Sequence, residues 1–132
     1  MPITHVALVG HCGFDSGSLA RFAGEVAPDA QVVRVNDQKT LDGLAGPGTL
    51  LLVNRVLDGR FDVGGSGIEL IRTLAGRDDA GPAMLVSNYD DAQQDARAAG
   101  ALPGFGKSHL ADPATKQRVT DAVAARSSSG PA

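Results

Sequence analysis

Short apolar runs alternate with amphipathic segments along the whole chain. The runs are continuously apolar rather than alternating with polar residues, which is typical of parallel strands that are buried on both faces. They lie at residues 4–9, 31–35, 49–54, 83–86 and 102–105. Apolar residues recur with helical spacing between and after them, at 18–26, 37–44, 68–74, 92–99 and 113–125. The pattern therefore predicts a β-strand followed by an α-helix, repeated five times.

This order of elements predicts a doubly wound α/β domain whose five-stranded parallel sheet is covered by helices on both faces. Capping residues predict helix ends, with Asp15 or Ser16 before the first helix and Gly100 after the fourth. We expect one domain over residues 1–125 and a disordered tail over residues 126–132.

Composition excludes several classes of function. The 132 residues suit a single domain, and the net charge of −3 provides no field that would attract nucleic acid or an anionic membrane. Cys12 is the only cysteine, so an intramolecular disulfide and a cysteine-based metal cluster are both excluded. No signal peptide and no membrane-spanning run are evident, and we expect a cytoplasmic protein.

Polar residues follow the predicted strands at the edge where chemistry gathers in open α/β sheets, outside the carboxyl ends of the strands. The ends of strands one, three, four and five carry Gly10 and His11, Asn54, Ser87, and Lys107. The third strand is the most apolar and ends on Asn54. An amide is not ionised at this position, so it is a poor nucleophile and a weak metal ligand.

The arrangement resembles the receiver domain of bacterial two-component response regulators over roughly residues 3–125. The resemblance implies a flavodoxin-like (CheY-like) fold with the strand order 2-1-3-4-5. The segment 54–59, Asn-Arg-Val-Leu-Asp-Gly, has the spacing of the receiver Asp-x-x-Met-Pro-Gly segment. The segment 84–87, Met-Leu-Val-Ser, is similar to the fourth receiver strand with its terminal Ser or Thr. The segment 98–101, Ala-Ala-Gly-Ala, followed by Lys107 is similar to the receiver Gly-Ala element and its lysine.

The resemblance implies a phosphorylated aspartate and a Mg²⁺ ion, but the residues depart from that pattern. Gly10 and His11 replace the acidic pair after the first strand, and Mg²⁺ prefers anionic oxygen ligands. Asn54 has no carboxylate oxygen with which to attack phosphorus. We therefore expect a degenerate receiver that has no enzymatic activity and has lost Mg²⁺ binding. Ser87 and Lys107 remain as the anion-binding half of the site.

A second departure concerns the aromatic residue that switches in receivers, three positions before the lysine. That position is Gly104, and the neighbouring Phe105 is expected to face the other side of the strand. The coupling between the strand-four hydroxyl and an aromatic side chain is therefore not expected here. The loop over residues 59–67 is also longer than in the family, and its glycines predict mobility.

We expect a stand-alone signalling domain that acts through contact with a protein partner or with a second copy of itself. The resemblance places that contact on the fourth helix, fifth strand and fifth helix, at about residues 90–125. Two alternatives stay open: a small-molecule, anion or cofactor binder at the strand ends, and a receiver phosphorylated at another residue such as Asp58. No role is assigned to Cys12 or to the imidazole of His11.

Overall fold

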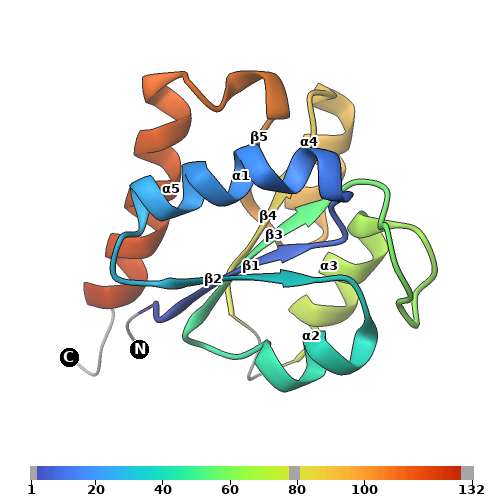
Figure 1. Cartoon of the computed structure of the whole chain (residues 1–132). Coiled ribbons are helices and arrows are strands. Elements are labelled where there is room, and N and C mark those ends of the chain that lie inside the picture. The colour runs from blue at the N-terminus through green and yellow to red at the C-terminus, as the bar shows by residue number, and fades with distance from the viewer. Residues whose placement is uncertain (1–2, 78–80, 129–132) are drawn as a thin grey trace.

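The computed structural model describes residues 3–77 and 81–128 and shows a five-stranded, all-parallel sheet (Figure 1). The strand order is β2-β1-β3-β4-β5, as the sequence predicts. The strands are β1 (His5–Val9), β2 (Gln31–Val35), β3 (Thr49–Asn54), β4 (Ala83–Val86) and β5 (Leu102–Phe105). The helices are α1 (Gly13–Val26), α2 (Gln38–Leu44), α3 (Gly67–Ala75), α4 (Asp90–Ala98), the 3₁₀ turn η1 (Lys107–His109) and α5 (Pro113–Ser128).

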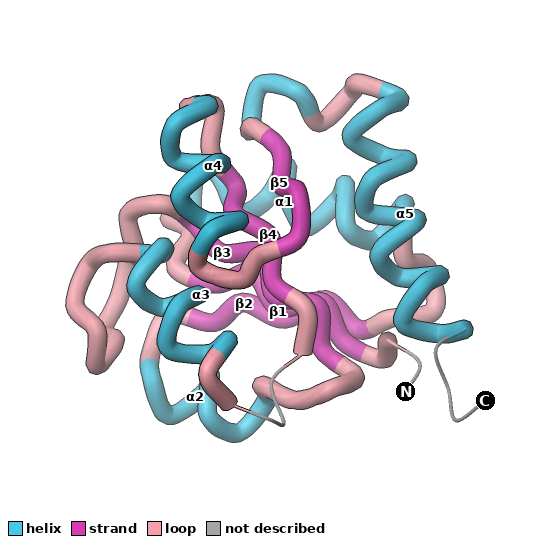
Figure 2. Tube along the Cα trace, turned by 180° about the vertical axis from the view of Figure 1, so that it is seen from behind, coloured by secondary structure: helices cyan, strands magenta, loops and turns pink. Residues whose placement is uncertain are grey.

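The helices form one layer on each side of the sheet. Helices α1 and α5 cover one face, and α2, α3 and α4 cover the other (Figure 2). Along β3, Leu50 and Leu52 share a core with Phe22 of α1, whereas Leu51 and Val53 join the core on the opposite face. Burial on both faces explains the continuous apolar run. No helix in the described part of the chain is both long and apolar enough to cross a membrane.

Helix α1 begins earlier than the sequence suggests. It starts at Gly13, so the prediction of a start at residue 18 with Asp15 or Ser16 as the cap is wrong. Cys12 precedes the helix and its side chain makes no capping bond. Ser16 is only 1% exposed and its hydroxyl donates to the Gly13 carbonyl, 3.3 Å away. Packing against the protein therefore stabilises an extra turn that local capping rules do not favour.

The last helix also differs at one end. Helix α5 begins at Pro113, as the pattern predicts, but it continues to Ser128. Residues 126–128 are therefore helical rather than part of a tail, and residues 129–132 lie outside the described residues. Gly100 follows α4 with a φ of +116°, the left-handed conformation expected of a residue that ends a helix.

The loop between β3 and α3 is tied down at several points. The Arg60 carbonyl accepts from the Gln38 N–H at 2.9 Å, and the Gly65 carbonyl accepts from the Leu57 N–H at 2.8 Å. Phe61 is only 9% exposed and packs with the core on the α2–α4 face. These contacts hold the loop against α2 and against its own first residues, where the glycines alone favour a free segment.

Candidate functional site at the strand ends

Three residues expected at the strand ends line one cavity of about 390 Å³. They are Asn54, Ser87 and Lys107. The register of the sheet explains their proximity, because Asn54 pairs with Val86 and Ser87 follows directly. The remaining described residues of this strand-end pocket are Arg55, Val56, Val86, Asn88 and Tyr89.

The Asn54 side chain is engaged with the main chain on two sides. Its Nδ2 donates to the Gly10 carbonyl at 3.3 Å and to the Val56 carbonyl at 2.8 Å. Both partners only accept hydrogen bonds, so the atom facing them must be the amide nitrogen. The Gly10 carbonyl also accepts from the Asp58 N–H at 2.8 Å. Asn54 therefore joins the end of β1 to the loop that follows β3.

Gly10 and His11 do not line the strand-end pocket. Gly10 has a φ of +74°, and a Cβ there would lie 2.5 Å from the Leu57 side chain, so the backbone requires glycine. His11 is 3% exposed, with its Nε2 2.8 Å from the Leu52 carbonyl oxygen. A carbonyl only accepts, so Nε2 carries the proton. His11 is thus turned into the protein rather than into the pocket.

A second amide, from Asn36, crosses the same edge. Its Nδ2 donates to the carbonyls of His11 at 3.1 Å and Asp58 at 2.8 Å. Asn36 lies directly after β2, so it joins the ends of β2 and β1 to the loop after β3. Sequence reasoning missed this residue. Its position one residue beyond a predicted strand is the signal that could have revealed it.

The residues present do not fit the Mg²⁺ ion that the receiver resemblance implies. Every described residue that lines the strand-end pocket lacks a carboxylate, and the Gly10 carbonyl is already shared by two donors. Over residues 3–77 and 81–128, no group of three or more His, Cys, Asp or Glu side chains is arranged to hold a metal. A hard divalent cation prefers several anionic oxygens, which this edge does not supply.

A third amide holds the junction of β4 and β5. Gln93 of α4 donates through Nε2 to the carbonyls of Leu85 at 2.9 Å, Ser87 at 3.1 Å and Phe105 at 3.3 Å. The pairing of β4 with β5 shifts register at this point. A Cβ on Gly104 would lie 2.1 Å from the Leu85 carbonyl oxygen and 2.6 Å from Gln93 Oε1. Gln93 therefore occupies the space that a side chain at position 104 would need.

Phe105 faces away from Gly104, as strand alternation requires. It is 3% exposed, and its ring centroid lies 5.4 Å from that of Phe22 in the core on the α1 side. Gln93 was not anticipated from the sequence. The other inward residues of α4 are Ala92 and Ala96, and a glutamine beside two small buried residues is the signal that could have revealed it.

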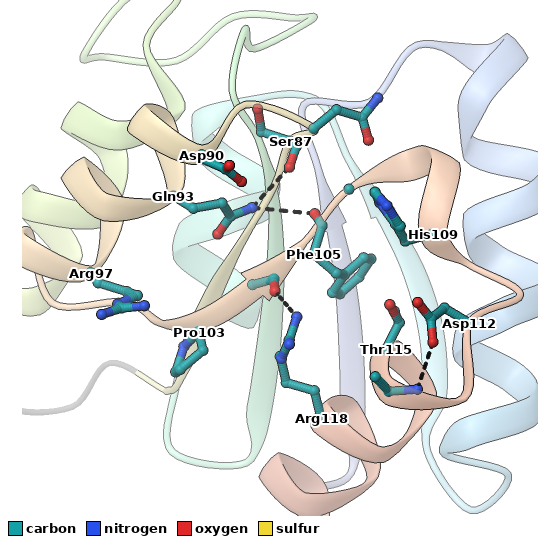
Figure 3. A pocket seen from close by; sticks show the side chains of 14 residues that line it. Ser87, Asp90, Gln93, Arg97, Pro103, Phe105, His109, Asp112, Thr115 and Arg118 are labelled. Carbon is teal, nitrogen blue, oxygen red and sulfur yellow. Dashed lines mark hydrogen bonds between the residues drawn. The ribbon is translucent and has the colours of Figure 1, made fainter.

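A second cavity, of about 340 Å³, lies along the open edge of β5 between α4 and α5 (Figure 3). Arg97, Pro103 and Arg118 follow this edge, and Arg118 donates through Nη1 to the Gly104 carbonyl at 2.5 Å. Ser87 and Asn88 line both cavities. These two consecutive residues therefore lie between the strand-end pocket and the α4–β5–α5 face.

Comparisons with known proteins identify the fold but do not assign the chain to a family. No protein-family model matches the sequence, and no curated protein matches it. Solved structures do match. The receiver domain of a DNA-binding response regulator from Colwellia psychrerythraea 34H has a TM-score of 0.60 and 18% identity, over 89% of this chain and 98% of that one. A response regulator from Burkholderia multivorans has a TM-score of 0.59 and 20% identity, over 100% and 98%.

The Mn²⁺-bound form of response regulator Rcp1 also matches, with a TM-score of 0.60 and 16% identity over 98% of this chain and 99% of that one. Identities of this size show a shared fold alone. The sheet order and the two helical layers are those of a CheY-like receiver domain. The chain therefore has the fold of response regulator receiver domains.

Proposed function

We propose that this protein is a signalling domain of the two-component type that is not phosphorylated in the usual way and acts through protein contacts. The observation that carries the proposal is the position of Asn54. At the strand end where the receiver resemblance expects the phosphoacceptor, its amide donates to two main-chain carbonyls. The proposal assigns the domain no catalytic activity of its own and expects it in the cytoplasm.

Phosphoryl transfer depends on an attacking oxygen and on cations that neutralise the developing charge. Asn54 presents a nitrogen donor toward the edge, and the described lining of its pocket contains no carboxylate that would hold a metal. The similar Rcp1 structure is a Mn²⁺-bound form, whereas we expect neither Mg²⁺ nor Mn²⁺ to bind at this edge.

The direct test is incubation with acetyl phosphate and Mg²⁺, followed by intact mass spectrometry. We expect no added phosphoryl group, and no change in the amide NMR spectrum with Mg²⁺ and beryllofluoride. A receiver domain that carries the aspartate serves as the positive control. A phosphoryl group on this chain would overturn the proposal, and mapping it to Asp58 would favour phosphorylation at an unusual residue.

The partner surface we propose is the α4–β5–α5 face, at about residues 90–125. Its exposed Arg97 and Lys116 supply cationic groups that a partner can contact, and the cavity along β5 gives it depth. Contact with a protein partner or a second copy is tested by Arg97→Glu with Lys116→Glu. The charge reversals should weaken association in sizing and pull-down experiments. Unchanged association would remove this face from the proposal.

A second candidate function, non-covalent anion binding, is favoured by one observation. Ser87, Asn88 and Lys107 line the same pocket as Asn54, and hydroxyl and ammonium groups bind oxyanions. Inorganic phosphate should then raise the melting temperature. Lys107→Gln should abolish that shift, whereas Lys116→Gln, at an exposed position on α5, should preserve it. Equal shifts in both variants would argue against a site in this pocket.

A further inference from the structure

Large hydrophobic side chains are exposed mainly on one side of the strand ends. Among the described residues, Val56 is 56% exposed, Tyr89 is 60% exposed and Leu102, on β5, is 38% exposed. Val56 and Tyr89 line both the strand-end pocket and an adjoining cavity of about 520 Å³ between the β3–α3 loop and α4. We name this region the Val56–Tyr89 surface; it comprises Arg55, Val56, Ile68, Tyr89, Asp91 and Asp95.

Hydrogen bonds fix the main chain that carries both apolar side chains. The Val56 carbonyl accepts from Asn54 Nδ2, and Val56 pairs with Ser66 in an isolated antiparallel bridge. The N–H of Tyr89 donates to the Ser87 hydroxyl at 3.2 Å, just before α4. The Arg55 guanidinium lies 5.0 Å from the centroid of the Tyr89 ring. A main chain fixed in this way loses little freedom on binding, which favours association.

The charge beside this apolar surface is negative. Asp91 and Asp95 lie one turn apart on α4 and line the 520 Å³ cavity. Neither forms an ion pair with any cation in the described chain. Arg55 is the one cation in the described lining, and it is stacked on Tyr89. A cationic group from outside would therefore meet two carboxylates next to exposed apolar side chains.

We propose that the Val56–Tyr89 surface binds a segment of a partner protein in which an apolar side chain is flanked by lysine or arginine. The apolar side chain would cover Val56 and Tyr89, and the basic groups would reach Asp91 and Asp95. This goes beyond the proposed function, which concerns the α4–β5–α5 face. The two surfaces use different sides of α4, because Arg97 lines the cavity along β5 whereas Asp91 and Asp95 line the 520 Å³ cavity.

The probe is a fluorescein-labelled amphipathic peptide with a leucine face flanked by lysines, measured by fluorescence anisotropy. A peptide with glutamate in place of each lysine is its counterpart. We expect the lysine peptide to bind at least tenfold more tightly. Val56→Ser with Tyr89→Ser should weaken its binding at least tenfold, whereas Leu102→Ser, at the other exposed large hydrophobic residue, should leave it unchanged.

A second pair of variants separates local charge from net charge. Asp91→Asn with Asp95→Asn removes two negative charges from the surface, and Glu25→Gln with Asp29→Asn removes two exposed ones elsewhere. Only the first pair should weaken binding, and NMR shifts should centre on Arg55, Val56 and Tyr89. Equal effects of both pairs, or no binding of the lysine peptide at millimolar concentration, would refute this proposal. Neither result bears on the phosphorylation test or on the Arg97 and Lys116 variants.

Discussion

Asn54 and Gln93 both donate side-chain amide hydrogen bonds to main-chain carbonyls, but they connect different parts of the sheet. Asn54 is half-buried and joins the end of β1 to the loop after β3 through two bonds. Gln93 reaches from α4 to three carbonyls of β4, β5 and the residue after β4. The receiver resemblance expects a phosphoacceptor at position 54 and a switching aromatic at position 104, beside Gln93.

This difference between Asn54 and Gln93 predicts which part of the structure a substitution of each residue would disturb. Loss of Asn54 would release one loop, whereas loss of Gln93 would remove a hydrogen bond from each of three carbonyls at an irregular strand pair. Two amides and one carboxylate near this edge also differ in their partners. Asn36 and Asn54 donate to converging carbonyls. The carboxylate of Asp37 instead accepts from the Thr40 N–H at 2.7 Å.

The largest effect is expected from Gly104→Ala. The added Cβ would lie 2.1 Å from the Leu85 carbonyl oxygen and 2.6 Å from Gln93 Oε1, so β5 or Gln93 must move. We expect a loss of about 2–4 kcal/mol in the free energy of unfolding, measured by urea denaturation. Gly24→Ala is the control, because nothing lies near its Cβ inside α1, and it should stabilise by about 0.5–1 kcal/mol. Equal effects would show that β5 adapts freely.

Gln93→Ala should have the next largest effect. It removes one donor from each of three carbonyls, of which Phe105 keeps the Ser87 N–H, and a buried acceptor left unsatisfied costs about 1–3 kcal/mol. Hydrogen exchange at the Ser87 N–H, which bonds the Phe105 carbonyl at 2.8 Å, should accelerate because the β4–β5 pairing loosens. Gln94→Ala, at the exposed neighbouring position of α4, should leave both the stability and the exchange rate unchanged. Similar results for both variants would contradict the clamping role of Gln93.

Hydrophobic patterning was enough to predict a parallel sheet with helices on both faces, because the continuous runs at 49–54 and 83–86 have no other stable place than the middle of a covered sheet. The strand order came from the receiver resemblance, because more than one order is compatible with the same pattern. The start of α1 was not predictable from local rules. Its first turn depends on the burial of Ser16, which only the assembled protein supplies.

The residues at the strand-end edge were predictable, but their hydrogen-bond partners were not. The ends of β3 and β4 could be aligned from the pattern, so Asn54 and Ser87 were expected near each other. The turn of His11 toward Leu52 depends on a buried carbonyl that no periodicity reveals. Gln93 acts across a register shift between β4 and β5, and such a shift arises from packing rather than from residue spacing.

Asn54→Asp should have an intermediate effect. The carboxylate would face the Gly10 and Val56 carbonyls without a hydrogen to donate, so we expect a loss of about 1–3 kcal/mol at pH 7. These oxygens disfavour the charged form and should raise the pKa of the introduced carboxyl. Because its folded pKa then exceeds its unfolded one, the loss should shrink as the pH falls and the group is protonated.

Asn88→Asp is the matched control for Asn54→Asp. Asn88 Oδ1 accepts from the Ser108 N–H at 3.2 Å and from its hydroxyl at 3.0 Å, and a carboxylate can accept both. Urea unfolding should therefore show little change for Asn88→Asp. The Asn54→Asp variant should also gain no phosphoryl group from acetyl phosphate with Mg²⁺, since no acidic pair accompanies it. Rapid phosphorylation would show that position 54 alone separates this chain from a working receiver.

The smallest effect is expected from Asp37→Asn, which tests the carboxylate side of the comparison. Hydrogen bonds from the hydroxyl and N–H of Thr40 lower the pKa of Asp37. A folded pKa below the unfolded one means that this contribution to stability is present above about pH 4 and is lost as the pH falls through the folded pKa.

Asparagine caps a helix about as well but does not titrate. The urea midpoint of the variant should equal that of the native chain below pH 3 and should lie slightly below it near neutral pH. The difference between the two midpoints should therefore change in one step at acidic pH. A flat difference from about pH 2 to 7 would mean that the Asp37 carboxylate gains nothing from the N–H groups it faces.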